Sequence, residues 1–147
     1  MSDKIKVGII GCGGIANGKH LPALSHQKSR VDIIAFCDLI LERAEKAAKE
    51  YGTPDAKVYT DYKELLKDER IDVVHVLTPN VAHCELTVAA LEAGKHVMCE
   101  KPMAATPADA KKMLDAQKKS GKLLTIGYQN RYRQDSQVLK KMCEAGT

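Results

Sequence analysis

The residues with the clearest chemical potential lie near the start of the chain, where an apolar run leads into the segment GCGGIA at positions 11–16. Gly11 permits a tight turn, Gly13 lets a ligand approach the backbone, and Ala16 lets a helix pack closely on the preceding strand. The first N–H groups of such a helix are free and carry its positive dipole end. The segment therefore predicts a turn that binds a pyrophosphate, with contacts from Gly11, Cys12, Gly13, Gly14 and Ile15.

An acidic residue, Asp38, ends the next apolar run. At this place in a dinucleotide site, a carboxylate accepts hydrogen bonds from the adenosine ribose and repels a 2′-phosphate. Leu39 follows it, with no Ser-Arg pair to hold a 2′-phosphate, so the sequence favours NAD over NADP. Arg43 keeps NADP possible, because its side chain could turn toward that phosphate. The structural alternatives are a solvated Asp38 at a strand end and a surface Arg43 on a helix.

Three polar tripeptides follow further apolar runs, at Thr78–Asn80, Glu100–Pro102 and Gln129–Arg131. The carboxyl ends of parallel strands meet at one edge of a sheet, which is where α/β proteins bind ligands. Each tripeptide also has a structural interpretation. Asn80 could cap a helix, Glu100 and Lys101 could form a surface ion pair, and Arg131 could be solvated. We favour a shared site because all three are expected at the edge that carries the glycine loop.

These groups must be positioned by strands that alternate with helices. Several apolar runs are nearly continuous, which is typical of strands covered on both faces of a parallel sheet. Strands are predicted near residues 4–10, 31–37, 57–59, 72–77, 96–99 and 122–128. The helices between them carry end signals, such as Thr106 and Asp109 as a capping box before a helix that ends at Gly121. The sequence therefore predicts an α/β, doubly wound Rossmann fold that fills residues 1–147 as one domain.

Composition excludes several other classes of protein. The chain has 147 residues, and 23 Lys and Arg against 19 Asp and Glu give a net charge of +4. Basic residues are scattered, and one Phe and no Trp argue against nucleic-acid binding. No apolar run is long enough for a membrane span and no export signal is present, so we expect a cytoplasmic protein. Five cysteines without a C-x-x-C pair are expected to be reduced thiols, with no metal site.

Several motifs together resemble one enzyme family. They are VLTPNVAH at positions 76–83, ALEAGKHVMCEKP at 90–102, the glycine loop, HLPAL at 20–24 and GYQNRY at 127–132. This combination resembles the nucleotide-binding domain of the Gfo/Idh/MocA oxidoreductases, over essentially the whole chain. The resemblance implies an enzyme that moves hydride between a nicotinamide and a sugar, a polyol or a related hydroxyl compound.

The resemblance also implies roles for individual residues. Lys101 matches the family's catalytic lysine, and partial burial near the nicotinamide would lower its pKa. Glu100 would orient that lysine or the nicotinamide ribose. The nicotinamide side of the site would be lined by Leu77, Thr78, Pro79 and Asn80, with His83 one helical turn beyond. For His83, a packing role in the helix is the alternative, and His75 is expected to be a core residue with its hydrogen bonds satisfied.

Members of that family continue into a second domain, which supplies further catalytic residues, most of the substrate pocket and the oligomer interface. We therefore expect the full-length protein to be a homo-oligomer, and this chain to bind dinucleotide with little or no turnover of its own. Two alternatives remain open from the sequence. One is a non-catalytic dinucleotide-binding or sensing module. The other is an S-adenosylmethionine methyltransferase, in which the TPN and EKP motifs would have no evident role.

Overall fold

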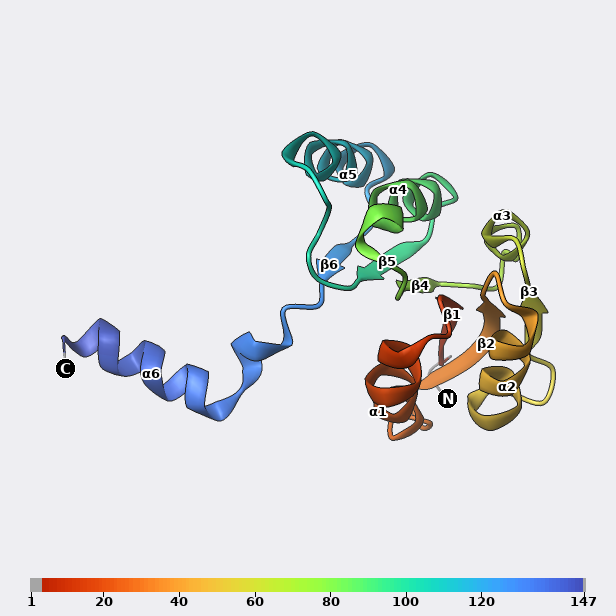
Figure 1. The fold of residues 1–147 in the computed structure, drawn as a ribbon, viewed down its shortest axis with the longest axis horizontal. Coiled ribbons are helices and arrows are strands. Elements are labelled where there is room, and N and C mark those ends of the chain that lie inside the picture. The colour runs from red at the N-terminus through yellow and green to blue at the C-terminus, as the bar shows by residue number, and fades with distance from the viewer. Residues whose placement is uncertain (1–3, 147) are drawn as a thin grey trace.

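A single parallel sheet organises the computed structural model, which describes residues 4–146 (Figure 1). Its six strands have the order β3-β2-β1-β4-β5-β6, and every neighbouring pair is parallel. The strands are β1 (Ile5–Ile10), β2 (Val31–Cys37), β3 (Lys57–Tyr59), β4 (Val73–Val76), β5 (His96–Cys99) and β6 (Leu124–Ile126). The chain leaves β1 toward one edge and returns to add β4 on its other side. This reversal opens a crevice at the carboxyl ends of β1 and β4.

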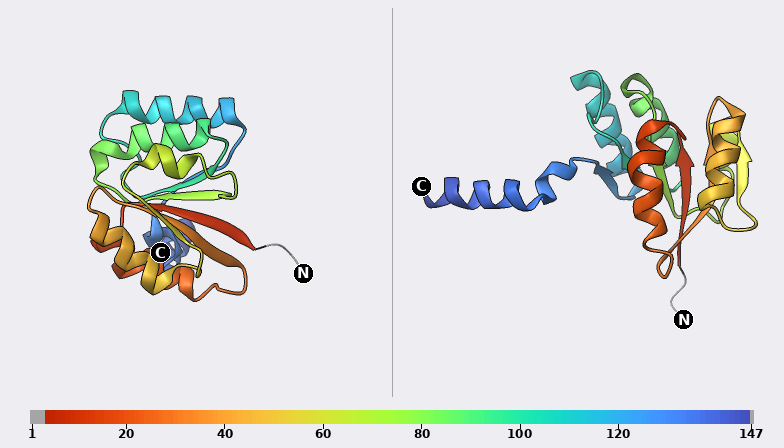
Figure 2. Two further views of the ribbon diagram at one scale, coloured as in Figure 1. Left: turned by 90° about the vertical axis from the view of Figure 1, so that its right-hand side faces the viewer. Right: turned by 60° about the horizontal axis from the view of Figure 1, so that its bottom comes forward.

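Helices cover the sheet in two layers. The α-helices are α1 (Leu21–Ser25), α2 (Leu41–Tyr51), α3 (Tyr62–Leu66), α4 (His83–Glu92), α5 (Pro107–Ser120) and α6 (Gln134–Ala145). A π-helical turn, η1 (Ala16–His20), precedes α1, and 3-10 turns η2 (Asn80–Ala82) and η3 (Gln129–Tyr132) precede α4 and α6. Figure 2 shows α1 and α2 on one face of the sheet, and α3, α4 and α5 on the other. The predicted doubly wound Rossmann fold is confirmed.

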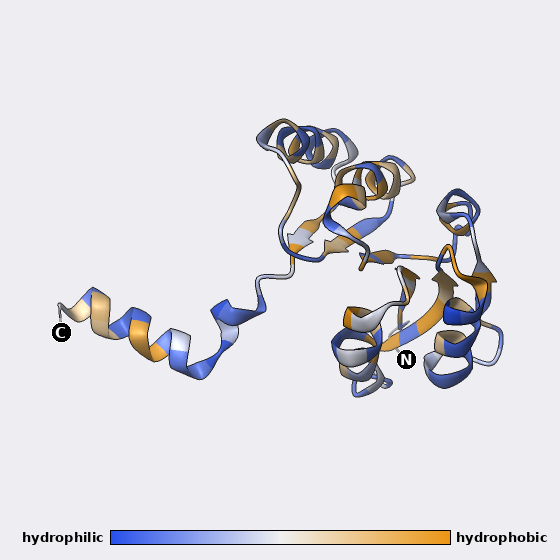
Figure 3. Cartoon of the chain, viewed as in Figure 1, coloured by the Kyte–Doolittle hydropathy of each residue, from blue (hydrophilic) through white to orange (hydrophobic). Residues whose placement is uncertain are grey.

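Two hydrophobic clusters, one on each face of the sheet, explain the continuous apolar strands. Ile9 and Phe36 are fully buried in the cluster that includes residues of α1 and α2. Val74 and Val76 are fully buried in the opposite cluster, with residues of α3, α4 and α5. Figure 3 shows the strands as the most hydrophobic part of the chain. Alternate residues of one strand therefore enter different cores, and neither face can be polar.

The ends of the helices follow their predicted signals in part. Thr106 caps α5 by accepting a hydrogen bond from the Asp109 N–H at 3.1 Å, and its hydroxyl donates to the Asp109 carboxylate at 2.8 Å. Gly121 ends α5 in the left-handed region, at φ +67°. Asn80 differs from the expectation, because its side chain caps neither η2 nor α4. The chain enters α4 through η2 instead, so the first residue of α4 is His83.

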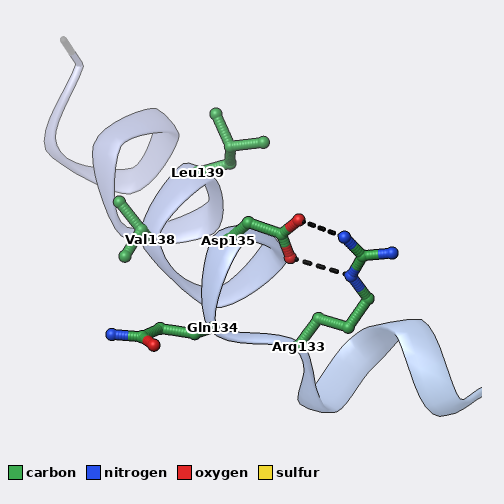
Figure 4. Close-up of a pocket in the computed structure, with 5 residues that line it drawn as sticks. All are labelled: Arg133, Gln134, Asp135, Val138 and Leu139. Atoms are coloured by element: carbon green, nitrogen blue, oxygen red, sulfur yellow. Dashed lines mark hydrogen bonds and ion pairs between the residues drawn. The ribbon is translucent and has the colours of Figure 1, made fainter.

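The last helix, α6, lies apart from the layered body (Figure 1). Within the described chain, η3 is the one element with which α6 shares more than marginal contacts. Its first turn is held by Arg133, whose Nη2 and Nε donate to the Asp135 carboxylate at 2.6 and 3.1 Å (Figure 4). Val138 and Leu139 are 49% and 62% exposed. Among residues 4–146, no helix combines the length and apolar character needed to cross a bilayer.

Candidate functional site

The glycine loop forms a tight turn between β1 and the helix that follows it. Gly11 has φ +95°, and a Cβ placed there would lie 2.6 Å from the carbonyl oxygen of Leu77 on the neighbouring strand connection. Only glycine fits this position, because both the left-handed backbone and the close approach exclude a side chain. The Asn17 amide then donates to the carbonyl oxygens of Cys12 and Gly13 at 2.7 and 2.9 Å, which fixes the far side of the turn.

Gly13 and Gly14 have a different environment from Gly11. Apart from each glycine's chain neighbours and the local helix backbone, no described residue lies within 4 Å of a Cβ placed at either position, so both glycines border open space. The helical conformation begins at Gly14, and the N–H groups of a first helical turn have no acceptor within their own helix. The loop therefore directs backbone N–H groups that lack an acceptor, and the positive end of the helix dipole, toward open space. These features fit a pyrophosphate group.

Asp38 is oriented by the backbone around it. Its Oδ2 accepts a hydrogen bond from the Cys12 N–H at 2.8 Å, and its Oδ1 accepts one from the Ile40 N–H at 2.9 Å. The carboxylate therefore connects the end of β2 to the glycine loop, and each oxygen keeps a second lone pair for a ligand. Burial, and secondarily the charge of Asp38, raises the pKa of Cys12 to about 12. Cys12 is thus a neutral packing thiol beneath the loop.

The TPN turn forms the wall on the β4 side of the crevice. Thr78 lies beside Gly11, and its buried hydroxyl has no hydrogen-bond partner among the described residues. Buried hydroxyl groups are nearly always paired, so this oxygen is available to a ligand in the crevice. Asn80 is exposed, and without a capping role its amide is also free to face a ligand.

A cavity of about 820 Å³ lies between these segments. This volume lies within the range of small-molecule and cofactor sites. The predicted site residues that line it are Gly11, Gly13, Gly14, Ile15, Asp38, Leu77, Thr78 and Pro79. A smaller hollow of about 460 Å³ on the outer side of the loop is lined by Cys12 and Asn17, and Arg43 borders both spaces. The cavity thus brings together the glycine loop, Asp38 and part of the TPN turn, whereas Asn80 and the tripeptides Glu100–Pro102 and Gln129–Arg131 do not line it.

The far wall of the cavity contains residues that the sequence prediction missed. Tyr62 from α3 donates from its hydroxyl to the Glu85 carboxylate of α4 at 2.8 Å, and both residues line the cavity. The hydrogen bond to Glu85, with burial next, raises the pKa of Tyr62 to about 12. No motif connects these two residues, which lie 23 positions apart in the sequence. Only the packing of α3 beside α4 brings them together.

The EKP turn follows β5, and none of its residues lines this cavity. Glu100 is 7% exposed, and its Oε1 lies 2.7 Å from Nε2 of His20, a residue for which the sequence predicted no role. Its Oε2 accepts a hydrogen bond from the Lys101 N–H at 2.9 Å. The alternative of a surface pair between Glu100 and Lys101 is therefore wrong. The Lys101 side chain is exposed, so the partial burial expected for it is not observed.

His83 has the buried packing position that was its alternative, and His75 lacks the hydrogen bonds expected for it. His83 is fully buried, with Nδ1 2.8 Å from the Pro102 carbonyl oxygen and Nε2 2.9 Å from that of Thr78. It therefore lies behind the site rather than in the lining of the cavity. For His75 the expectation of satisfied hydrogen bonds is wrong, since its buried Nδ1 has no partner among the described residues. The ring instead stands edge-on to His20, with centroids 5.6 Å apart.

Comparison with known proteins identifies relatives of this chain. It is 39% identical over 143 residues to an inositol 2-dehydrogenase from Salmonella typhimurium, and covers 42% of that protein. It is 39% identical over 145 residues to a D-glucoside 3-dehydrogenase from Escherichia coli, and covers 40% of it. These alignments include 97% and 99% of this chain. The chain thus spans about two fifths of the length of the relatives that it matches.

Solved structures show the same fold. The WlbA dehydrogenase from Bordetella pertussis, in complex with NADH and UDP-GlcNAcA, matches 98% of this chain with a TM-score of 0.90 and 30% identity. A 3-ketoreductase from Actinomadura kijaniata, in complex with NADP and TDP-benzene, matches 98% with a TM-score of 0.88 and 28% identity. The chain covers 43% of each of these two proteins.

The family model agrees with these relatives. A model of the Gfo/Idh/MocA oxidoreductases, described as an NAD-binding Rossmann fold, matches residues 5–128. This match excludes the methyltransferase alternative and favours an oxidoreductase over a sensing module. With its glycine loop, its oriented carboxylate and its TPN and EKP turns on one sheet edge, the chain belongs to the Gfo/Idh/MocA oxidoreductase family and forms the NAD-binding Rossmann domain of that family.

Proposed function

We propose that this chain is the cofactor-binding part of an NAD(P)-dependent oxidoreductase that transfers hydride between a nicotinamide and a hydroxyl carbon of a sugar or polyol. The observation that carries this proposal is the cavity beside the glycine loop. Asp38 and the TPN turn border this cavity, and the EKP turn follows the next strand of the same sheet edge. The relatives that act on inositols and on a glucoside support the class of substrate.

In this proposal the cofactor binds along the crevice. Gly11, Gly13, Gly14 and Ile15 contact the pyrophosphate through the backbone, and Asp38 accepts hydrogen bonds from the adenosine ribose. Cys12 contributes its backbone beneath the pyrophosphate, since its N–H is already bound to Asp38. The nicotinamide half extends along Leu77, Thr78, Pro79 and Asn80 toward the EKP turn. Of the two roles that the sequence allows for His83, we favour packing, because the structure buries this residue completely.

Lys101 is the proposed catalytic residue. When bound, the nicotinamide accepts or supplies the hydride. As hydride leaves the hydroxyl carbon, the neutral amine of Lys101 takes the hydroxyl proton, and the carbon–oxygen bond becomes a carbonyl. In the reverse direction the ammonium group of Lys101 returns this proton. Glu100 holds the Lys101 backbone through the N–H of that residue, so its role is to orient the turn.

The remaining parts of the proposal concern the whole protein. Because the relatives are more than twice as long as this chain, we propose that residues 1–147 form one domain and that a second domain supplies the substrate pocket and the contacts of a homo-oligomer. We also propose a cytoplasmic location, where a dissociable NAD(P) cofactor would be supplied. The exposed apolar residues of α6, Val138 and Leu139, are consistent with a contact to that second domain.

The first experiment is calorimetric titration of this chain with NADH and, separately, NADPH. We expect saturable binding of NADH at least tenfold tighter than that of NADPH, because the Asp38 carboxylate repels a 2′-phosphate. Asp38→Asn should reduce this preference, whereas Glu50→Gln, on the outer side of the loop, serves as a matched control. Tighter binding of NADPH than of NADH would indicate that Arg43, rather than Asp38, determines the choice of cofactor at the adenosine end. Binding of neither cofactor would contradict the proposal for this chain.

The catalytic role is tested in the two-domain enzyme. Lys101→Ala should lower kcat by about 10²–10⁴-fold, the usual contribution of a general acid–base group. The affinity for NADH should change little, because Lys101 lies outside the pyrophosphate and adenosine contacts. Lys118→Ala, on the exposed side of α5, is the control. A Lys101→Ala enzyme that retains wild-type kcat would contradict the role of Lys101 and favour a non-catalytic module.

A further inference from the structure

Two histidines contact the EKP turn from opposite parts of the cofactor site. His20 ends η1, the turn that follows the glycine loop, and its Nε2 lies 2.7 Å from the Glu100 carboxylate. His83 begins α4, the helix that follows the TPN turn, and its Nδ1 lies 2.8 Å from the Pro102 carbonyl oxygen. Each of the two segments proposed to bind the cofactor is thus joined to the turn that carries Lys101.

The His83 ring lies between two backbone carbonyl groups. Both ring nitrogens face backbone carbonyl oxygens, which can only accept hydrogen bonds. A neutral imidazole has one N–H and can donate to only one of them, whereas an imidazolium donates to both. In either state the ring lies within hydrogen-bond distance of both carbonyl oxygens, at 2.8 and 2.9 Å. The His83 side chain therefore connects the TPN turn to the EKP turn.

The position of Lys101 depends on its backbone. Its side chain is exposed, so surrounding side chains do not enclose it. The hydrogen bonds of the turn instead act on the backbone around it, through the Lys101 N–H to Glu100 and through the Pro102 carbonyl to His83. Glu100 is itself held in place by His20, and by its close approach to Gly127, where a Cβ would lie 3.3 Å from Oε1.

We propose that His20 and His83 are positioning residues that hold the EKP turn and transmit cofactor binding at the glycine loop and the TPN turn to Lys101. This inference rests on the proposed function, because it assigns to Lys101 the catalytic role given above. It adds two residues that act through others and contact neither cofactor nor substrate. Each connection to the EKP turn consists of a single side chain. His20 contacts Glu100 from the segment after the glycine loop, and His83 contacts Pro102 from the helix after the TPN turn.

The test is amide hydrogen exchange of the ¹⁵N-labelled chain, with and without saturating NADH. The Lys101 N–H is a direct probe, because it donates to Glu100. In the wild-type chain, NADH should slow its exchange at least tenfold. In His20→Leu and His83→Phe, at NADH concentrations that saturate each variant, this slowing should be lost. His20→Gln, whose amide can donate to Glu100, should restore it, and His26→Gln on the exposed end of α1 should behave as wild type.

Ring ¹⁵N spectra of the unmodified chain provide a second measurement, which does not depend on whether a variant folds. We expect a ring N–H of His83 with the chemical shift of a hydrogen-bonded group. A His83 ring N–H without a hydrogen bond, or equal NADH-dependent slowing at Lys101 in His83→Phe and wild type, would overturn the proposal. If wild-type chain fails to bind NADH, the proposed function fails instead, while Lys101 exchange in the free variants still tests whether the two histidines hold the turn.

Discussion

At the scale of single residues, the glycines of the loop have two separable roles. Gly11→Ala should destabilise the fold by at least about 2 kcal/mol, because a left-handed backbone and a Cβ 2.6 Å from the Leu77 carbonyl oxygen both oppose it. Gly13→Ala should leave stability nearly unchanged, since that position is open, and should weaken NADH binding at least tenfold by blocking the approach of the pyrophosphate. Urea unfolding and calorimetry measure the two effects.

The matched pair provides its own control. Equal losses of stability in the two variants would show that the loop is uniformly strained, and would remove the distinction between a structural and a binding glycine. Unchanged NADH affinity in Gly13→Ala would show that the pyrophosphate lies elsewhere.

The lowered pKa of His75 predicts how the free energy of unfolding depends on pH. Burial, and secondarily the charge of His20, lowers the pKa of His75 from 6.5 to about 4. Below pH 6.5 the unfolded chain therefore binds a proton that the folded chain does not, so stability falls as the pH drops from 6.5 toward 4. His75→Leu should reduce the loss of unfolding free energy between pH 7 and 4.5 by about 2–3 kcal/mol.

The measurement for His75 is urea unfolding at both pH values. His26→Gln is the control, because His26 is exposed and its loss should leave the acid dependence as in wild type. Parallel loss of stability in wild type and His75→Leu would assign the acid sensitivity to other groups.

At the scale of elements, the N-cap of α5 tests how much one local hydrogen bond contributes to the free energy of unfolding. Thr106→Ala removes the hydroxyl that accepts from the Asp109 N–H and should lower the free energy of unfolding by about 1 kcal/mol. The urea m-value should not change, because the same surface is exposed on unfolding. Thr106→Ser keeps the hydroxyl and should retain most of the stability. If the Ser and Ala variants lose the same amount, the methyl group of Thr106, rather than its hydrogen bond, stabilises the helix end.

Elements also differ in how well the sequence predicted them. The strands Val31–Cys37, Lys57–Tyr59 and His96–Cys99 begin and end where the apolar runs do. The run at 122–128 is longer than β6 (Leu124–Ile126), because β6 is one of the two edge strands and pairs only with β5. Pairing partners set the length of an edge strand, and a run of residues along the chain contains no information about them.

At the scale of the whole molecule, α6 should contribute little to the stability of the layered body. A chain that ends at Arg133 should unfold within about 0.5 kcal/mol of the 147-residue chain, because α6 makes its main contacts with η3 alone. A 12-residue helix without tertiary support is marginal in water, so its amides should exchange quickly. Urea unfolding and hydrogen exchange check both results. A loss of more than about 1 kcal/mol would show that α6 packs on the body in solution.

The order of residues along the chain was enough to predict the fold class and eight of the 20 residues that line the cavity. Those residues follow from local rules: a turn that needs glycine at Gly11, a carboxylate at the end of a strand, and polar tripeptides where parallel strands stop. Their spacing along the chain is sufficient because every parallel strand presents its carboxyl end to the same edge of the sheet. For this reason the order of residues alone assigns Asp38 and the TPN turn to one site.

The pairing of polar groups with one another depends on the tertiary structure. The approach of His20 to Glu100 joins residues 80 positions apart, and Tyr62 meets Glu85 only because α3 and α4 pack side by side. The exposure of Lys101 and the burial of His83 were also decided at this level. Hydrogen bonding and burial depend on distances between elements, and those distances are set by how helices pack on the sheet rather than by the order of residues.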